Sequence, residues 1–368
     1  MAINRRQFLK FSALAVLGSV APGVVAGGSA DYLLSCRNDE AGKHFVSLFD
    51  PTSGDILWDI QLPSRGHGVC LSPDHKHAAV FARRPGDFMW VLDLNKRSIV
   101  HKISSSEDRH YYGHGVFSHD GKHLYASEND FENAEGKIGV YAVEQGFIKI
   151  YEFSSYGIGP HEIGLLSDGQ TLVAANGGIR THPDMPRAKL NIATMRPNLA
   201  YIDVATGEML RRFEPPQEWH QLSIRHIDVS RDNQVAIAMQ YEGAKHKRPP
   251  LIAIQQGNGE LQMLKAPEGL HKQMKNYCGS VTYARDGKSF AVSSPRGGLI
   301  SYWGSDGEFL GVDRQADACG LASRSCGFWV SDGRGKVTKR CLSDIGSPVE
   351  TVRTQDTLWD NHMVSYQS

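Results

Sequence analysis

The stretch SHDGKHLYASEN, residues 118–129, carries the signals of a β-hairpin. An Asp-Gly pair, which favours a tight turn, is followed by a run of alternating apolar and polar residues typical of a half-buried strand. Related stretches occur at 71–82 (LSPDHKHAAVFA), 166–177 (LSDGQTLVAANG) and 284–295 (ARDGKSFAVSSP). The chain therefore repeats one hairpin along its length.

A second phrase accompanies the first one at a regular distance. It occurs at 48–60 (LFDPTSGDILWDI), 91–100 (VLDLNKRSIV), 140–150 (VYAVEQGFIKI) and 201–213 (YIDVATGEMLRRF). It too reads as two strands joined by a turn, so each repeat contains four short strands. Four strands in roughly 40 to 50 residues are typical of a propeller blade.

One residue at the same point of every repeat allows the blades to be counted. The anchor residues are His67, His114, His161, His226, Cys278, Cys319 and His362. Their successive intervals are 47, 47, 65, 52, 41 and 43 residues, and the two chain ends left over together make about one more repeat. We therefore predict an all-β, seven-bladed propeller with four antiparallel strands per blade. Its last blade is closed by the N-terminal strands, which removes exposed sheet edges.

The N-terminus indicates export. Arg5 and Arg6 precede an apolar stretch over 11–26 that is 16 residues long, which is shorter than the roughly 20 needed to cross a bilayer. This pattern resembles a twin-arginine signal. We predict a signal peptide over 1–30 and a propeller over 31–368 that is periplasmic and has no membrane anchor after cleavage.

Composition excludes some classes of partner. The 40 Lys and Arg residues balance the 40 Asp and Glu residues, so a nucleic-acid partner is not expected. We expect a monomer. The chain has no GxSxG, HExxH or GxxxxGK motif, and no catalytic residue is assigned.

The anchor residues begin the innermost strands, so they are expected to surround one mouth of the channel. Two interpretations remain open for this ring. Neutral imidazoles can hydrogen-bond neighbouring blades together, or the imidazoles and the two thiols can bind copper, zinc or iron. Because opposite blades are expected to be far apart, only neighbours such as His67, His114 and His362, or His161 and His226, are expected to share a metal.

Polar residues beside the anchors are candidates for orienting imidazoles or contacting a substrate. They are Glu162, Asp228, Asp360 and Asn361. Strand alternation points an immediate neighbour such as Glu162 away from the channel and puts Asp360, two residues before His362, on the side of His362. The alternative for each carboxylate is an ordinary hydrogen bond at a strand end.

The loops between the second and third strands of each blade belong to the same face as the anchors. Their charged residues are predicted to face a partner, and a long insertion over 176–198 contributes several of them. The candidates are Arg83, Arg84, Arg180, His182, Asp184, Arg187, His246 and Arg296.

The six cysteines form no CxxC or CxxCH motif, so covalent haem attachment is not indicated. Cys326 and Cys341 flank a turn over 333–335 and are predicted to lie within one register step of each other on paired strands, where a disulfide can form after export.

Several motifs together resemble a bacterial family catalogued as domain of unknown function 1513, within the superfamily of YVTN and nitrous-oxide-reductase-like propellers. They are the Arg5-Arg6 signal, GHG at 66–68 and 113–115, GPHE at 159–162 and WDNH at 359–362. The family has no established activity, and its members tend to be encoded near iron-regulated and di-haem redox proteins. The resemblance implies a periplasmic binding or scaffold protein in iron or copper handling, with iron-handling or redox proteins as partners. The alternative is a metal-dependent periplasmic enzyme, either hydrolytic and lactonase-like or redox, at the same mouth.

Overall fold

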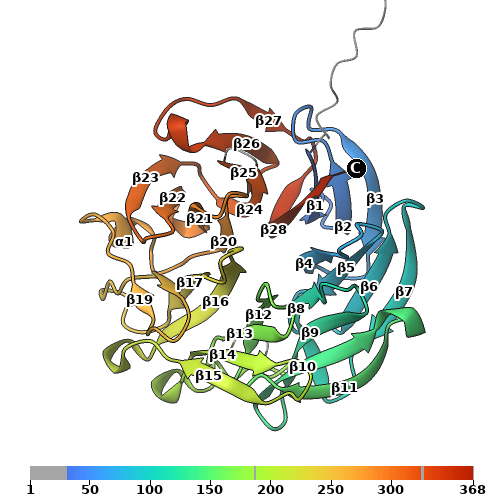
Figure 1. The fold of residues 1–368 in the computed structure, drawn as a ribbon. Helices are drawn as coiled ribbons and strands as arrows, with labels where there is room; N and C mark the ends of the chain where they lie inside the picture. The colour runs from blue at the N-terminus through green and yellow to red at the C-terminus, as the bar shows by residue number, and fades with distance from the viewer. Residues whose placement is uncertain (1–30, 186–187, 325–326, 368) are drawn as a thin grey trace, which may run out of the picture. The chain divides into compact units, whose positions relative to one another are not determined.

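Each repeated hairpin forms the two inner strands of a four-stranded antiparallel sheet. In the computed structural model, the described residues form seven such sheets, and Figure 1 shows them arranged around a central axis. The structure describes residues 31–185, 188–324 and 327–367, and Asp31–Gln367 form one compact unit. The predicted signal segment 1–30, Arg187 and Cys326 lie outside the described residues. The seven-bladed, all-β prediction is confirmed.

The blades follow one another along the chain, each with its innermost strand first. The first three are β4 (Gly66–Leu71), β5 (His77–Ala82), β6 (Phe88–Asp93) and β7 (Ser98–Ser104); β8 (Arg109–Phe117), β9 (His123–Asp130), β10 (Glu135–Ala142) and β11 (Ile148–Ser154); and β12 (Pro160–Leu165), β13 (Thr171–Asn176), β14 (Asn198–Asp203) and β15 (Met209–Phe213). The next three are β16 (Leu222–Val229), β17 (Val235–Tyr241), β18 (Ile252–Gln255) and β19 (Gln262–Met263); β20 (Ser280–Tyr283), β21 (Ser289–Ser294), β22 (Leu299–Gly304) and β23 (Phe309–Arg314); and β24 (Ala318–Arg324), β25 (Gly327–Asp332), β26 (Lys336–Cys341) and β27 (Thr351–Arg353).

The seventh blade joins the two ends of the described chain. Its innermost strand is β28 (Leu358–Gln367), followed by β1 (Asp31–Asn38), β2 (His44–Phe49) and β3 (Ile56–Leu62). β28 pairs antiparallel with β1 from Asp31 opposite Gln367 to Asn38 opposite Leu358. The predicted closure by the N-terminal strands is therefore confirmed.

Helical segments are short and lie in the connections. They are α1 (Leu270–Gln273) and the 3₁₀ turns η2 (Val143–Gln145), η3 (Ile192–Thr194), η4 (Gln217–Trp219), η5 (Pro295–Gly297) and η6 (Leu342–Asp344). None of these described helices has the length and apolar character needed to cross a bilayer.

The turn between the first and second strands uses the same hydrogen bond in four blades. A carboxylate oxygen accepts the backbone N–H two residues further on, at 2.8–3.1 Å, which closes an Asx turn. The pairs are Asp74 with Lys76, Asp120 with Lys122, Asp168 with Gln170, and Asp286 with Lys288. This local chemistry sets where each innermost strand ends, and thus where the anchor residue at its other end lies.

Candidate metal centre

Five histidines from five consecutive blades meet on the axis. They are His362 of β28, His67 of β4, His114 of β8, His161 of β12 and His226 of β16. Neighbouring ring centroids are 4.6 to 5.1 Å apart, from His362 to His67, on to His114 and His161, and on to His226. We call these residues the imidazole cluster.

The expectation that only adjacent blades share a site is wrong. His226 and His362 belong to blades that are not neighbours, yet their ring centroids are 4.8 Å apart, and the ring centroid of His114 lies 4.5 Å from that of His362.

Glycines beside the anchors leave room for this convergence. A Cβ at Gly68 would lie 3.0 Å from Nδ1 of His114, so the second glycine of the first GHG motif makes space for an imidazole of the next blade.

β-Bulges aim the side chains at the axis. The pairing register slips between Pro160 and Glu162 in β12 and between Ile224 and His226 in β16. Because a bulge adds one residue to a strand, strict alternation of side chains is lost at that point. Glu162 consequently reaches the cluster next to His161, and the prediction that it points away from the channel is wrong.

Glu162 connects three blades through two imidazoles. Its Oε2 lies 3.1 Å from Nδ1 of His226 and also accepts the backbone N–H of Ile227, while its Oε1 lies 3.3 Å from Nδ1 of His114. Burial raises the pKa of Glu162, but the two imidazoles outweigh it and hold the pKa well below its usual range. Glu162 is therefore an ionised carboxylate that orients both rings.

Asp360 has the same role at the closing blade. One of its carboxylate oxygens accepts a hydrogen bond from Nε of Arg65 at 2.6 Å, and the other lies 3.1 Å from Nδ1 of His67. The pKa of this buried group is lowered, because the bonds to His67 and Arg65 outweigh the effect of burial. Asp360 and Glu162 thus contact imidazoles of the cluster, as the imidazole-orienting role predicted from the sequence requires.

Four of the five rings in the cluster are neutral imidazoles. Burial lowers the pKa of His67 to about 3 and lowers those of His161, His226 and His362, so these rings are neutral at pH 7. A neutral imidazole has one N–H and one lone pair, and an ionised carboxylate can only accept. His67 and His226 therefore donate through Nδ1 to Asp360 and Glu162, which leaves Nε2 of each of these two rings with a lone pair.

Three ring nitrogens of the cluster are buried without a hydrogen-bond partner among the described residues. They are Nε2 of His114, Nδ1 of His161 and Nε2 of His362. These histidines are only 5%, 8% and 8% exposed. An unsatisfied buried polar atom costs about 1 to 3 kcal/mol, so three of them in one place point to a missing partner.

Two groups of donors in the cluster lie close enough together to hold a metal ion. Potential ligand atoms of His114, Glu162, His226 and His362 lie within 4.8 Å of one another, and so do those of His67, His114 and His161. Tetrahedral nitrogen ligands about 2.1 Å from a metal are about 3.4 Å apart. The donor atoms of either group therefore lie at most about 1.4 Å beyond this spacing.

Cationic side chains surround a pocket of about 200 Å³ above the cluster. His67, His161 and His226 line the pocket together with cations of several blades, which are Arg83, Arg84, Lys189, Arg225 and Arg296. Burial lowers the pKa of Arg83, and the nearby Arg65 lowers it further. The approach to the imidazole cluster is thus strongly positive.

Comparison with known proteins agrees with this architecture. The family described as "Protein of unknown function (DUF1513)" matches residues 60–366. The chain belongs to this family. A search of curated proteins found no match.

Solved structures similar to this DUF1513 protein share its fold. One is a chain of hydrazine synthase from Kuenenia stuttgartiensis, with 15% identity, a TM-score of 0.57 and coverage of 78% of this chain and 81% of that one. Another belongs to a mitotic checkpoint complex, with 13% identity, a TM-score of 0.57 and coverage of 79% and 78%. At these identities the likeness shows the fold alone.

The two anchor thiols of the DUF1513 protein do not join the imidazole cluster. Cys278 is fully buried in an apolar core with its sulfur 3.9 Å from the carbonyl of Leu251, and the sulfur of Cys319 lies 3.4 Å from the carbonyl of Asp360. Burial raises the pKa of both thiols. Neither belongs to a metal-binding group found among the described residues.

The predicted disulfide between Cys326 and Cys341 involves Cys326, which lies outside the described residues.

Asp228 stabilises a blade interface instead of orienting an imidazole. It accepts hydrogen bonds from the backbone N–H of Tyr283, at 2.7 Å, and from the hydroxyl of Thr282, at 3.1 Å, both in the next blade. Asn361, in contrast, lines the cationic pocket, and its N–H donates to Asp360.

The predicted partner-facing loops of the DUF1513 protein divide into two groups. Arg83, Arg84 and Arg296 line the cationic pocket. Arg180, Asp184 and His246 are exposed, and His182 packs against Phe131.

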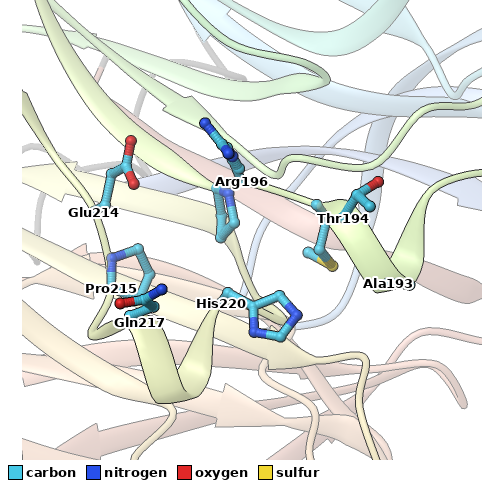
Figure 2. Close-up of a pocket in the computed structure, with 9 residues that line it drawn as sticks. Ala193, Thr194, Arg196, Glu214, Pro215, Gln217 and His220 are labelled. Carbon is cyan, nitrogen blue, oxygen red and sulfur yellow. The ribbon is translucent and has the colours of Figure 1, made fainter.

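A larger pocket, of about 590 Å³, lies beside the insertion. Figure 2 shows Arg196, Glu214 and His220 around it. None of its lining residues belongs to a metal-binding group of the described chain.

Sequence reasoning missed Arg225 and Lys189, which line the cationic pocket, and Arg65, which pairs with Asp360. Arg225 immediately precedes an anchor histidine, and this adjacency was a usable signal. Only the bulge in β16 brings it to the pocket. Lys189 reaches the pocket from the long insertion, whose path no local pattern specifies.

Proposed function

We propose that this protein binds a divalent first-row transition metal ion in the imidazole cluster and serves as a periplasmic binding or scaffold protein in copper or iron handling. The observation that carries the proposal is the set of three buried ring nitrogens without a partner, on His114, His161 and His362. A buried imidazole nitrogen without a hydrogen-bond partner is a group that a metal ion can satisfy.

The donor set favours particular metals. Imidazole suits copper, zinc and iron, and the affinity of a given site rises from Fe²⁺ to Cu²⁺ and falls again at Zn²⁺. Glu162 and Asp360 hold Nδ1 of three rings and fix their orientation, as carboxylates do behind metal-ligating histidines. We therefore expect Cu²⁺ to bind most tightly, with Fe²⁺ as the second cation of interest.

Metal content and affinity test the proposal. We expect one tightly bound Cu²⁺ per chain in the wild type, and a loss of at least 100-fold in affinity for His114→Ala combined with His362→Ala. The matched control is His220→Ala combined with His246→Ala, which removes two exposed imidazoles and should leave the affinity unchanged. Equal affinities in wild type and cluster variant, or no metal in either, would overturn the proposal.

The pocket that leads to the imidazole cluster favours a second candidate function, that of a metal-dependent periplasmic enzyme. Catalytic metal sites keep a position open for substrate, and the pocket of about 200 Å³ reaches three of the cluster histidines. Turnover of lactone and thiol substrates by metal-loaded protein, lost in the cluster variant, would establish this function. Metal binding without turnover on these panels would leave the binding role.

A further inference from the structure

The pocket above the imidazole cluster has one sign of charge. Its lining includes four arginines and one lysine but no carboxylate, and these residues come from the loops or strands of four blades. Glu242 pairs with Lys189 and lies 3.9 Å from Arg225, and Asp360 is already engaged by Arg65 and His67. The available carboxylates are too few to balance these cations.

Arg225 is the clearest sign of a missing ligand. Its side chain is buried, with 6% exposure, it lines the pocket, and its Nε has no hydrogen-bond partner in the described part of the chain. A guanidinium offers five N–H donors and is costly to bury unpaired. Carboxylate and phosphate oxygens match its planar fork.

Aromatic rings hold two further guanidinium groups at the rim. Arg296 stacks over Tyr277 with 4.2 Å between its Cζ and the ring centroid, and Arg84 lies 5.9 Å from the ring centroid of Tyr112. Stacking fixes the plane of a guanidinium and leaves its N–H edges free to donate. The rim is therefore organised before any ligand arrives.

The size of the pocket limits what can bind. Its volume of about 200 Å³ equals the share of roughly six or seven water molecules in the liquid. This space suits a phosphate or a short dicarboxylate and is below the usual range of drug-sized ligand sites.

We propose that this pocket binds a small oxyanion with at least two negative charges, of the phosphate or dicarboxylate type, between the arginines and the imidazole cluster. The inference deepens the proposed function and rests on it in one respect: the anion would supply oxygen ligands to a metal held by the histidines below. Anion and metal binding should then be coupled, each raising the affinity for the other by the same factor.

Calorimetric titration of the full mature chain tests the proposal. The probes are inorganic phosphate, sulfate and succinate, with chloride as a monovalent comparison, each added to metal-free and to Cu²⁺-loaded protein. We expect phosphate or succinate to bind at least tenfold more tightly than chloride, and at least fivefold more tightly once metal is loaded. The phosphate and succinate arms identify which anion chemistry the pocket prefers.

Variants localise the binding site. Arg225→Gln should weaken anion binding at least tenfold, and Arg296→Gln provides an exposed second test if the buried substitution prevents folding. Arg180→Gln, at an exposed arginine of the insertion outside the pocket, is the matched control and should have no effect.

The outcomes separate the two proposals. No preference for divalent anions over chloride, or affinities that neither Arg225→Gln nor Arg296→Gln changes, would overturn the anion site and leave the metal proposal intact. Anion binding that Arg225→Gln weakens, in a wild-type protein that takes up no added Cu²⁺, would support the anion site and overturn the metal proposal.

Discussion

Gly113 lies directly against the imidazole of His67, across the interface between two blades. A Cβ at position 113 would lie 2.6 Å from Cδ2 of His67, and the residue has a φ of +102°, which L side chains rarely adopt. Two independent constraints therefore require glycine at position 113, the first residue of the second GHG motif. One is the backbone conformation and the other is the neighbouring imidazole ring. Its position explains why glycine accompanies histidine in the repeat.

Substitution of this glycine should harm both fold and site. We expect Gly113→Ala to lower the free energy of unfolding by about 2 to 4 kcal/mol, because it adds a steric conflict to an unfavourable φ, and to weaken Cu²⁺ binding. Gly121→Ala is the control: its φ is +71° and its nearest neighbour lies 3.9 Å away, so about 1 kcal/mol is expected. Equal losses in urea unfolding would contradict the packing argument.

The carboxylate behind the imidazoles should control metal affinity. Glu162→Gln retains the shape of the side chain but removes the charge, and its amide N–H₂ would face one of two protonated Nδ1 atoms. We expect a 10- to 100-fold loss of Cu²⁺ affinity with a folded protein. Glu135→Gln, at an exposed carboxylate that pairs with Lys137, should bind metal like the wild type. An unchanged affinity for Glu162→Gln would exclude this orienting role.

A buried histidine away from the cluster should make stability depend on pH. Burial lowers the pKa of His110 to about 4 from an unfolded value of 6.5, partly opposed by a hydrogen bond to the carbonyl of Tyr111. Its neutral form stabilises the fold fully above pH 6.5, and this contribution is lost as the pH falls towards 4. Between pH 7 and pH 5 it should amount to about 2 kcal/mol.

Urea unfolding of wild type and His110→Gln at both pH values measures this contribution. The variant keeps a polar side chain near Asn129 but cannot take up a proton. Its loss of stability from pH 7 to pH 5 should be about 2 kcal/mol smaller than that of the wild type. Parallel losses in the two proteins would show that His110 does not titrate in this way.

The two anchor cysteines should be dispensable for metal. Cys278→Ala and Cys319→Ala should keep wild-type Cu²⁺ stoichiometry, because neither sulfur belongs to a metal-binding group of the described residues and burial raises the pKa of both thiols. Each substitution should cost about 1 kcal/mol in unfolding free energy through lost packing. If either variant loses as much metal as His362→Ala does, the substituted cysteine must be a metal ligand.

Export remains a prediction from the N-terminal sequence. We expect Arg5→Lys combined with Arg6→Lys to hold the precursor in the cytoplasm, because the twin arginines are the feature that the export pathway reads. Fractionation of cells followed by immunoblotting compares the variant with the wild type. Equal periplasmic amounts would argue against twin-arginine export.

Much of the fold follows from local sequence patterns. The Asx turns of Asp74, Asp120, Asp168 and Asp286 depend on residues two apart in the chain, so each hairpin can be recognised without knowledge of the rest. The spacing between these hairpins then fixes the number of blades, and the two incomplete ends predict the closure by β1 and β28.

The site was predictable in its residues but not in its geometry. His67, His114, His161, His226 and His362 were identified because they recur at one point of the repeat. The inward turn of Glu162 was not predictable, because strand alternation fails at the bulge between Pro160 and Glu162. The convergence of the five histidines and the exclusion of Cys278 and Cys319 were not predictable either, because they depend on how the blades pack around the axis.

The sequence by itself thus determined the architecture and the identity of the ring histidines, since both rest on short-range turn chemistry repeated at a regular period. Only the tertiary structure decided which donors face one another. Contacts such as that between Glu162 and His226, or between Asp360 and His67, join strands of different blades. Their distances depend on bulges and close packing at the axis, which no period in the sequence records.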